Sequence, residues 1–401
     1  MGLAVRRRLR QRTGCERTSA LTHPPTRRRI ETVRSRGRAS RPGEQACPLS
    51  VDPGGCPAEL SDGTPQPGPD ILPLMLEFVF LGTSAGSPTR LRNVSGLAVR
   101  LSQRRDWFLI DAGEATQHRL LTTSLSPAQC VGVFITHAHG DHCYGLPGLI
   151  SSLSLAGRQS PLTVWGPDAV LRWLTTTIDL TGLHPTFPLD LRSTATEPTL
   201  VWDDHLVFHA RRLDHQVVTH AFDIEAHRRQ RSLDPVALDA LGVPRGPDWG
   251  ALQRGETIEV AGSVITPDQV STLVDSSVRA ICGGDNATPD ILAPHVAGLD
   301  LLIHEATYGQ AAWDQAAPRV RHSSVTQVAQ FAQRSGIPNL ILTHFSPRYH
   351  DLSELAQEAR AHYDGICHLA ADGDTFTLSP ASPGPARLVF EQVSGRVGGP
   401  L

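Results

Sequence analysis

Short apolar segments recur along the chain from residue 75 onward, and each is six to eight residues long. Segments of this length are typical of buried β-strands when turn-forming residues such as Gly, Pro, Asn and Asp bound them. The pattern predicts strands at 76–82, 94–101, 106–113, 131–137, 162–167, 206–213, 278–285, 299–306, 338–345 and 374–380.

Four other segments carry apolar residues at the three- and four-residue spacing of a helix. They are residues 145–157, 167–178, 323–335 and 352–363. Strands that alternate with helices predict an α/β fold in which helices cover the faces of a sheet. No repeat of solenoid length accompanies this alternation.

Residues 1–74 lack this periodicity and are rich in Arg, Pro, Gly and Ser. They contain 13 arginines against seven acidic residues and so form a basic extension on an otherwise acidic chain. We expect the extension to be disordered, either as a transit or nucleic-acid-binding tail or as an artefact of gene-start assignment. Met75 is the only methionine besides Met1 and stands directly before the first strand, which favours the artefact. An acidic remainder requires any nucleic-acid site to be a local basic patch.

The composition argues against a membrane protein and against a secreted one. No apolar stretch approaches the roughly 18 residues of a membrane span, and the basic start of the chain lacks the apolar segment of a secretory signal. The seven cysteines are scattered without a CxxC pair. This usage predicts a reducing, cytoplasmic setting rather than a disulfide framework.

The segment FITHAHGDH carries three histidines and an aspartate at the end of the predicted strand 131–137. His137 and His139 are two residues apart and project to the same side of an extended chain, while Asp141 and His142 follow as the chain turns. Two such pairs that leave one short loop can serve two neighbouring metal ions. Imidazole and carboxylate ligands without thiolate favour Zn²⁺, with Mn²⁺ as an alternative.

Additional candidate ligands stand at the ends of other predicted strands. They are His215, Asp285, His304, Glu305 and His344. Each alone is a weak signal, but α/β folds place ligand sites at the carboxyl ends of strands. Their shared location predicts that they contribute to the same metal centre.

The segment GTSAG at 82–86 matches the nucleophile-elbow pattern and makes Ser84 an alternative catalytic nucleophile. That pattern requires a strand, a sharp turn and a helix, whereas Pro88 favours a loop here. We therefore expect a glycine-rich loop that brings backbone N–H groups near an anionic group.

These segments resemble ribonuclease Z, the tRNA 3′-processing endonuclease family of the metallo-β-lactamase superfamily. The similar segments are FLGTSAGSPTRLRN (80–93), DAGEATQ (111–117), FITHAHGDHCYGLPGL (134–149), LDH (213–215), GD (284–285), HEATY (304–308), HSS (322–324) and THFSPRY (343–349). They follow one another in the family's order from Leu76 to the C-terminal part of the chain. The resemblance implies a four-layer αββα sandwich over residues 75–391 with an inserted protruding arm, followed by a tail at 392–401.

The resemblance also implies a ligand set. His137, His139 and His215 would hold one zinc ion, Asp141, His142 and His344 would hold the second, and Asp285 would bridge both. Asp141 would also act as the general base, while His322 and Glu305 would position the phosphate or protonate the leaving group. The implied reaction removes the 3′ trailer from precursor tRNA and leaves a 3′-hydroxyl on the tRNA.

In this family an arm grips tRNA, and the resemblance puts it at residues 222–260. A homodimer is implied too, in which the arm of one subunit presents tRNA to the metal site of the other. The RNA-binding candidates are Arg228, Arg229, Arg231, Arg245, Gly246, Pro247 and Arg254 in the arm, with Arg90 and Arg92 in the segment PTRLRN. The arm arginines would supply the local positive patch that phosphate recognition demands. Ala221, Phe222 and Asn286 depart from the residues usual in the family but leave the ligand set intact.

Two other functions stay open. A hydrolase of small phosphodiesters or sulfate esters would keep the ligands but lack a functional arm, so residues 222–260 discriminate. A non-catalytic RNA-binding protein would have no need of an intact Asp141.

Overall fold

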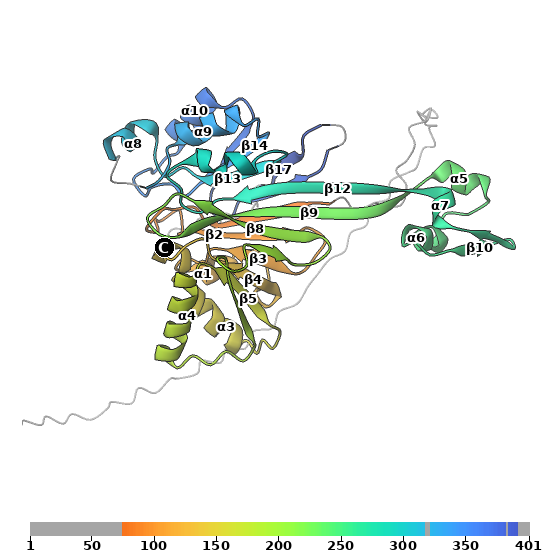
Figure 1. Ribbon diagram of the computed structural model, residues 1–401, viewed down its shortest axis with the longest axis horizontal. Helices are drawn as coiled ribbons and strands as arrows, with labels where there is room; N and C mark the ends of the chain where they lie inside the picture. Colours follow the sequence, from red (N-terminus) through yellow and green to blue (C-terminus); the bar gives the residue numbers. More distant parts are fainter. Residues whose placement is uncertain (1–73, 317–320, 382–383, 392–401) are drawn as a thin grey trace, which may run out of the picture. The chain divides into compact units, whose positions relative to one another are not determined.

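The computed structural model describes residues 74–316, 321–381 and 384–391. The extension expected before Met75, apart from Leu74, and the tail expected at 392–401 lie outside these residues. Within the described part, two large β-sheets pack face to face, and helices cover their outer faces (Figure 1). The expected four-layer αββα sandwich is confirmed.

The first sheet contains eight strands, several of which run parallel. Their order is β17 (Arg387–Glu391), β16 (Thr375–Ser379), β1 (Leu76–Gly82), β2 (Gly96–Leu101), β3 (Trp107–Ile110), β4 (Cys130–Phe134), β5 (Leu162–Gly166) and β6 (Leu189–Ser193). The last four are parallel neighbours, so a crossover must connect each to the next.

The second sheet contains seven strands, and the remaining candidate ligands lie on these strands or directly after them. Their order is β15 (Ile366–Leu369), β14 (Asn339–Thr343), β13 (Leu301–Glu305), β12 (Ser271–Cys282), β9 (Thr219–Leu233), β8 (Leu206–Leu213) and β7 (Thr199–Val201). Strands β12 to β15 run parallel, so their carboxyl ends meet at one edge of the sheet.

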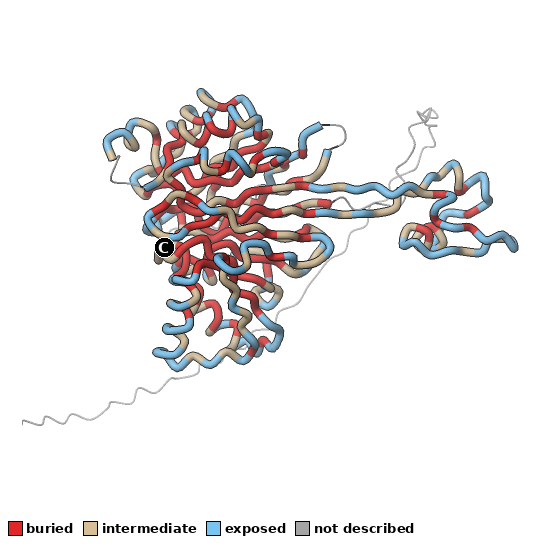
Figure 2. Tube along the Cα trace, viewed as in Figure 1, coloured by how far each residue is buried: buried red, intermediate tan, exposed pale blue. Residues whose placement is uncertain are grey.

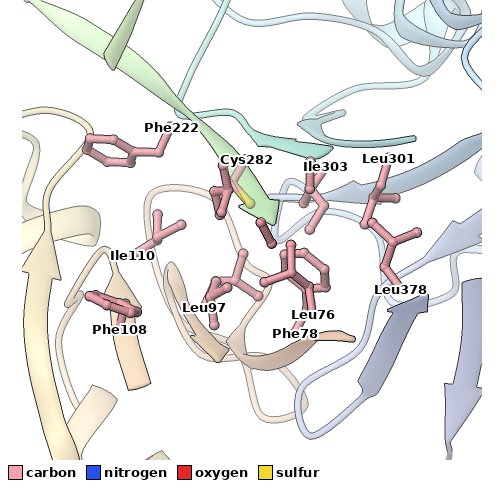
Figure 3. Packing of buried hydrophobic residues seen from close by; sticks show 14 of the residues in the cluster. Leu76, Phe78, Leu97, Phe108, Ile110, Phe222, Cys282, Leu301, Ile303 and Leu378 are labelled. Carbon is pink, nitrogen blue, oxygen red and sulfur yellow. The ribbon is translucent and has the colours of Figure 1, made fainter. Parts of the chain in front are cut away.

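A hydrophobic core fills the space between the two sheets. Figure 3 shows Phe78, Leu97 and Ile110 of the first sheet opposite Phe222 and Ile303 of the second. In β1 the alternate residues Val79 and Leu81 point away from this core and pack under the outer helices instead. Both faces of the strand are buried, which explains why its sequence is a continuous apolar run.

Each outer layer has its own apolar cluster. Helices α1 (Thr116–Leu120), α3 (Leu146–Leu155) and α4 (Asp168–Thr181) cover the first sheet. Helices α9 (Val325–Arg334) and α10 (Ser353–His362) cover the second, together with the 3₁₀ turn Pro289–His295. Two short helices, α2 (Gly140–Cys143) and α8 (Gln310–Ala316), and the 3₁₀ turn Pro127–Gln129 complete the body.

Strands β9 and β12 extend past their neighbours and carry a small separate unit (Figure 1). Strand β9 pairs with β8 only as far as Ala226, but its ladder with β12 continues to Leu233. The ribbon ends in α5 (Pro235–Ala240), α6 (Pro247–Gln253), β10 (Ile258–Val260), β11 (Ser263–Ile265) and α7 (Pro267–Val270). Figure 2 shows buried residues reappearing at this tip beyond the exposed ribbon, and they form a cluster around Trp249 and Leu252.

We call residues 227–277 the arm, since this is the part that leaves the sheet. The interval inferred from the sequence, 222–260, begins and ends earlier along the chain. Residues 222–226 belong to the sheet because they pair on both sides, and the return strand up to Ser277 belongs to the arm.

All ten predicted strands and all four predicted helices are present, with ends displaced by a few residues. The 278–285 segment is the inner end of the longer β12. Seven strands escaped prediction: β6, β7, β9, β10, β11, β15 and β17. The outer half of β9 is mostly charged or polar because the ribbon has no buried face there, so it carries no apolar period. Among the described residues, no helix has the length and apolar character needed to cross a membrane.

Candidate metal centre

The strand β4 delivers the first two candidate ligands. Its residues Val133 and Phe134 are fully buried, and the extended chain continues through Thr136 to His139. There α2 begins, and its first turn carries Asp141 and His142. The ring centroids of His137 and His142 lie 4.1 Å apart, so one short segment gathers both expected ligand pairs.

Residues from the second sheet complete the cluster. His215 follows β8, Asp285 follows β12 and His344 follows β14. Ligand atoms within 4.8 Å of one another form one set of His137, His139, His215 and Asp285 and another of Asp141, His142 and His344. A third set, Asp285, His322 and His344, shares members with both. The first two sets are the groups expected from the sequence, and the structure brings all seven residues together.

The carboxylate of Asp285 lies between the two sets and faces each with a different oxygen. Its Oδ2 lies 3.5 Å from His137 Nε2 and 3.7 Å from His215 Nε2. Its Oδ1 lies 3.3 Å from His142 Nε2 and 3.2 Å from His344 Nε2. A carboxylate in this position can bridge two cations.

The side chains of the cluster leave hydrogen-bonding atoms unsatisfied among themselves, and a bound metal ion would satisfy them. Two pairs of ring nitrogens face each other at 3.2 Å, His142 Nε2 with His344 Nε2, and His215 Nε2 with His139 Nδ1. His137 Nε2 and Asp285 Oδ1 are buried without a hydrogen-bond partner. Buried polar atoms without partners are costly in a native fold, and a bound cation would satisfy them. Imidazole and carboxylate ligands of this kind suit Zn²⁺.

The electrostatics of the cluster are those of crowded, buried ligands. Burial and the neighbouring histidines lower the pKa of His137 well below its usual value. Burial alone would lower the pKa of His142, but Asp285 and Asp111 outweigh it and raise that pKa. For Asp285, burial opposes ionisation, yet the surrounding histidines hold its pKa well below the usual range.

Three supporting residues were not predicted. Asp111 is buried, and its Oδ2 lies 2.6 Å from His142 Nδ1, while its Oδ1 accepts a hydrogen bond from Thr136 N at 2.8 Å. Thr136 Oγ1 in turn lies 3.0 Å from His137 Nδ1, and Thr307 Oγ1 lies 3.1 Å from His344 Nδ1. Such partners orient metal-binding imidazoles. The DAGEATQ segment was the available signal for Asp111.

Asp111 and His344 also share an unusual backbone conformation, with φ of 60° and 58°. This left-handed conformation is sterically unfavourable for residues other than glycine, and such strained residues cluster at functional sites. His344 adopts this conformation directly after β14, and its ring belongs to the candidate ligand cluster.

Glu305 and His322 form an ion pair beside the cluster. His322 Nδ1 lies 3.0 Å from Glu305 Oε1 and 3.8 Å from Asp285 Oδ2. Burial would lower the pKa of His322, but Glu305 raises it to about 9. His304, by contrast, is fully buried, lies 3.0 Å from the amide of Asn286 and belongs to none of the ligand sets.

The glycine-rich segment 82–86 forms a loop, as expected. Ser84 is fully buried and its hydroxyl donates to Ser87 O, so it is not placed as a nucleophile. Gly86 N donates to Asp141 Oδ2 at 2.7 Å. The loop thus brings one backbone N–H against a carboxylate of the cluster.

The two arginines of the segment PTRLRN differ. Arg90 is exposed. Arg92 is 6% exposed, and its Nη2 donates to Ser346 O at 3.3 Å and to Tyr349 O at 2.6 Å. Contrary to the sequence-based expectation, the guanidinium of Arg92 is turned inward and ties two loops together instead of facing a nucleic acid.

The arm carries no net positive charge, and several of its arginines pair with carboxylates. Residues 227–277 hold five arginines but seven acidic residues. Arg229 pairs with Asp275, Arg231 with Asp268 and Arg254 with Glu256, at 3.5, 2.6 and 2.8 Å. Arg228 donates to Gln103 at 2.7 Å, and Arg245 lies over the ring of Trp249. Gly246 and Pro247 begin α6 at the tip.

Comparisons with known proteins agree with this geometry. A family model described as a beta-lactamase superfamily domain matches residues 106–345. The ribonuclease Z of Marinobacter nauticus is 42% identical over 312 residues, which cover 76% of this chain and 96% of that protein. The ribonuclease Z of Pseudomonas putida strain W619 is 40% identical over 305 residues, or 74% and 94% of the two chains.

Solved structures share the fold at lower identity. The short form of human tRNase Z has a TM-score of 0.52 and 24% identity, covering 75% of this chain and 98% of that one. The metallo-β-lactamase fold protein YhfI of Bacillus subtilis has a TM-score of 0.54 and 17% identity, with 76% and 99% covered. At these identities the likeness concerns the fold alone.

Proposed function

Since the chain belongs to the ribonuclease Z family of the metallo-β-lactamase superfamily, we propose that it is a zinc-dependent endoribonuclease of tRNA maturation. The reaction cleaves the 3′ trailer from precursor tRNA and leaves a 3′-hydroxyl on the tRNA. The observation that carries this proposal is the Asp285 carboxylate, which faces one set of histidines with each oxygen. This arrangement supports a dinuclear centre of the kind that serves phosphodiester hydrolysis.

The residues present would hold two ions. His137, His139 and His215 would hold one, Asp141, His142 and His344 the other, with Asp285 between them. Zn²⁺ fits the donor set and Mn²⁺ is the alternative. When bound, such ions polarise a phosphodiester and lower the pKa of water to ~7.

Asp141 is the group we assign to proton transfer. Its Oδ2 is held by Gly86 N and lies 3.4 Å from His344 Nε2, which leaves Oδ1 to accept the proton of the attacking water. As the water oxygen joins phosphorus, the bond from phosphorus to the 3′ oxygen of the tRNA breaks. His322, held by Glu305, is positioned to supply a proton to that oxygen.

The arm supports an RNA substrate over a small phosphodiester. A small phosphodiester at the metal centre would not reach the arm. A tRNA is large enough to contact the arm while its 3′ end lies at the metal centre. The proposed contacts are Gly246, Pro247, the half-buried Arg228 and the exposed arginines Arg245 and Arg254. We propose a cytoplasmic homodimer in which one subunit's arm serves the other's metal centre.

The decisive experiment incubates the full chain with a precursor tRNA carrying a 3′ trailer, with and without a chelator. We expect release of the trailer with a new 3′-hydroxyl, loss of activity with chelator and recovery with Zn²⁺. A variant in which a two-residue Asn-Gly turn replaces residues 228–276 tests the arm, because the residues left on either side of the turn, His227 and Ser277, are paired across the ribbon. It should still hydrolyse a small chromogenic phosphodiester but lose precursor cleavage. Chelator-insensitive products, or none, would refute the proposal.

A further inference from the structure

An exposed aromatic ring stands at the rim of the metal centre. Tyr144 follows His142 by two residues, at the end of α2, and its side chain is 63% exposed. Aromatic residues make up only 5% of the chain, and most of the large rings are buried. A large ring left in water at such a position is informative, because aromatic side chains usually gain free energy from burial.

The ring lies directly against the ligand loop. A Cβ placed on Gly140 would be 2.4 Å from Tyr144 Cε2 and 2.6 Å from Cδ2. Gly140 stands between His139 and Asp141, one from each ligand set. The absence of a side chain at Gly140 therefore lets the ring lie against the backbone between two candidate ligands, while much of the residue stays open to solvent.

A second ring continues the surface. Trp173 of α4 lies beside Tyr144, with ring centroids 5.8 Å apart and planes inclined by 30°. Its indole also packs against the apolar cluster under α3 and α4, which fixes it in place. We call Tyr144 and Trp173 the aromatic ledge.

We propose that the aromatic ledge is a stacking site for an unpaired nucleobase adjacent to the scissile phosphodiester. The proposal rests on the proposed function, since it requires an RNA substrate. Unpaired bases are recognised by stacking on Tyr and Trp rings, and such stacking tolerates any base because every base has a π-face. A site of this kind would hold the RNA strand at the metal centre without restricting the trailer sequence.

The test combines protein variants with altered substrates. Tyr144→Ala and Trp173→Leu are compared with Tyr144→Phe, which keeps the stacking face, and with Phe390→Ala, a change at an exposed ring on β17. Substrates are a precursor tRNA with its natural trailer and two versions with an abasic ribonucleotide, one at the first trailer position and one at the nucleotide before the cut. Metal content, thermal midpoint and oligomeric state are measured for every variant.

We expect Tyr144→Ala to lower kcat/KM on the intact precursor about 10- to 100-fold, while Tyr144→Phe and Phe390→Ala stay near wild type. On one of the two abasic substrates, the wild type should be slow as well, and Tyr144→Ala should cause no further loss. A purely structural role for Tyr144 would instead reduce cleavage of all three substrates equally and would overturn the proposal. A loss explained by a change in oligomeric state would also overturn it. If the wild type cleaves no precursor at all, the proposed function itself fails.

Discussion

The backbone N–H of Gly86 donates a hydrogen bond of 2.7 Å to Oδ2 of Asp141, 55 residues away along the chain. Gly86 has φ of +70°, a conformation that a residue with a side chain adopts at a cost. The glycine-rich loop therefore fixes one oxygen of the proposed base. The carboxylate of Asp372 anchors both ends of the same loop, since it accepts hydrogen bonds from Thr83 Oγ1 and Asn93 N.

The first prediction concerns this contact. Gly86→Ala should lower stability by about 1–2 kcal/mol and also reduce kcat, because the strained backbone shifts the N–H away from Asp141. Gly157→Ala is the matched control, since Gly157 has φ of +78° and, like Gly86, no atom within 4 Å of an added Cβ. It should cost similar stability without loss of activity. Denaturant unfolding and single-turnover cleavage measure the two effects, and equal activity in both variants would contradict the role given to Gly86.

The second prediction concerns the division of ligands. His215→Ala should remove about one metal ion per chain, as should His344→Ala, because each belongs to a different set. Asp285→Ala should lower the affinity at both positions, since its oxygens face both sets. Elemental analysis after dialysis measures the stoichiometry. Chelation of the wild type should lower its thermal midpoint, because an ion that binds the folded state alone stabilises it. Loss of both ions, or of neither, in His215→Ala or in His344→Ala would argue against two separate ions.

The third prediction separates Arg90 from Arg92. Arg92→Ala should destabilise the fold by about 2–4 kcal/mol, because it leaves two backbone carbonyls without a charged donor. Arg90→Ala should leave stability unchanged, since the side chain is exposed, and should weaken precursor binding if this loop contacts RNA. Unfolding and binding assays on the two variants measure these effects. Equal stability of both variants would contradict the inward role of Arg92.

The fourth prediction concerns the arm's charges. Arg245→Ala should weaken tRNA binding more than Arg254→Ala, because Glu256 already offsets the charge of Arg254 at 2.8 Å. Among the described residues Arg245 has no acidic partner within 4.0 Å and lies over Trp249. Affinity measured across a salt series should also give a shallow slope, since three of the five arm arginines already pair with carboxylates and few remain to neutralise phosphates. A larger loss for Arg254→Ala would contradict this assignment.

The fifth prediction concerns pH. Burial, with a contribution from Arg212, lowers the pKa of His220 to about 4, below the 6.5 of the unfolded chain. The unfolded state therefore binds the extra proton between pH 6.5 and 4, so stability present above pH 6.5 is lost as pH falls through this range. The slope is at most about 1.4 kcal/mol per pH unit. His220→Leu should flatten the pH dependence of the free energy of unfolding, measured by urea titration of metal-free protein. If the slope of unfolding free energy against pH is unchanged in this variant, His220 does not cause the pH dependence.

Much of this protein was readable from local sequence. Buried strands such as β1 can be predicted because both of their faces are apolar. The segment from His137 to His142 could be recognised as a metal site because four of its six residues can bind a metal ion. The outer half of β9 could not be read in this way, since a strand without a buried face has no apolar pattern to detect.

The sequence by itself determined the layered α/β fold and the residue types of the centre, because burial and metal affinity act on each residue's own chemistry. Only the tertiary structure decided which oxygen of Asp285 faces which set, that Arg92 turns inward while Arg90 does not, and that acidic residues of the arm pair with three of its five arginines. These relationships join residues far apart in the chain. Their geometry depends on how strands and loops meet in space, which no local pattern encodes.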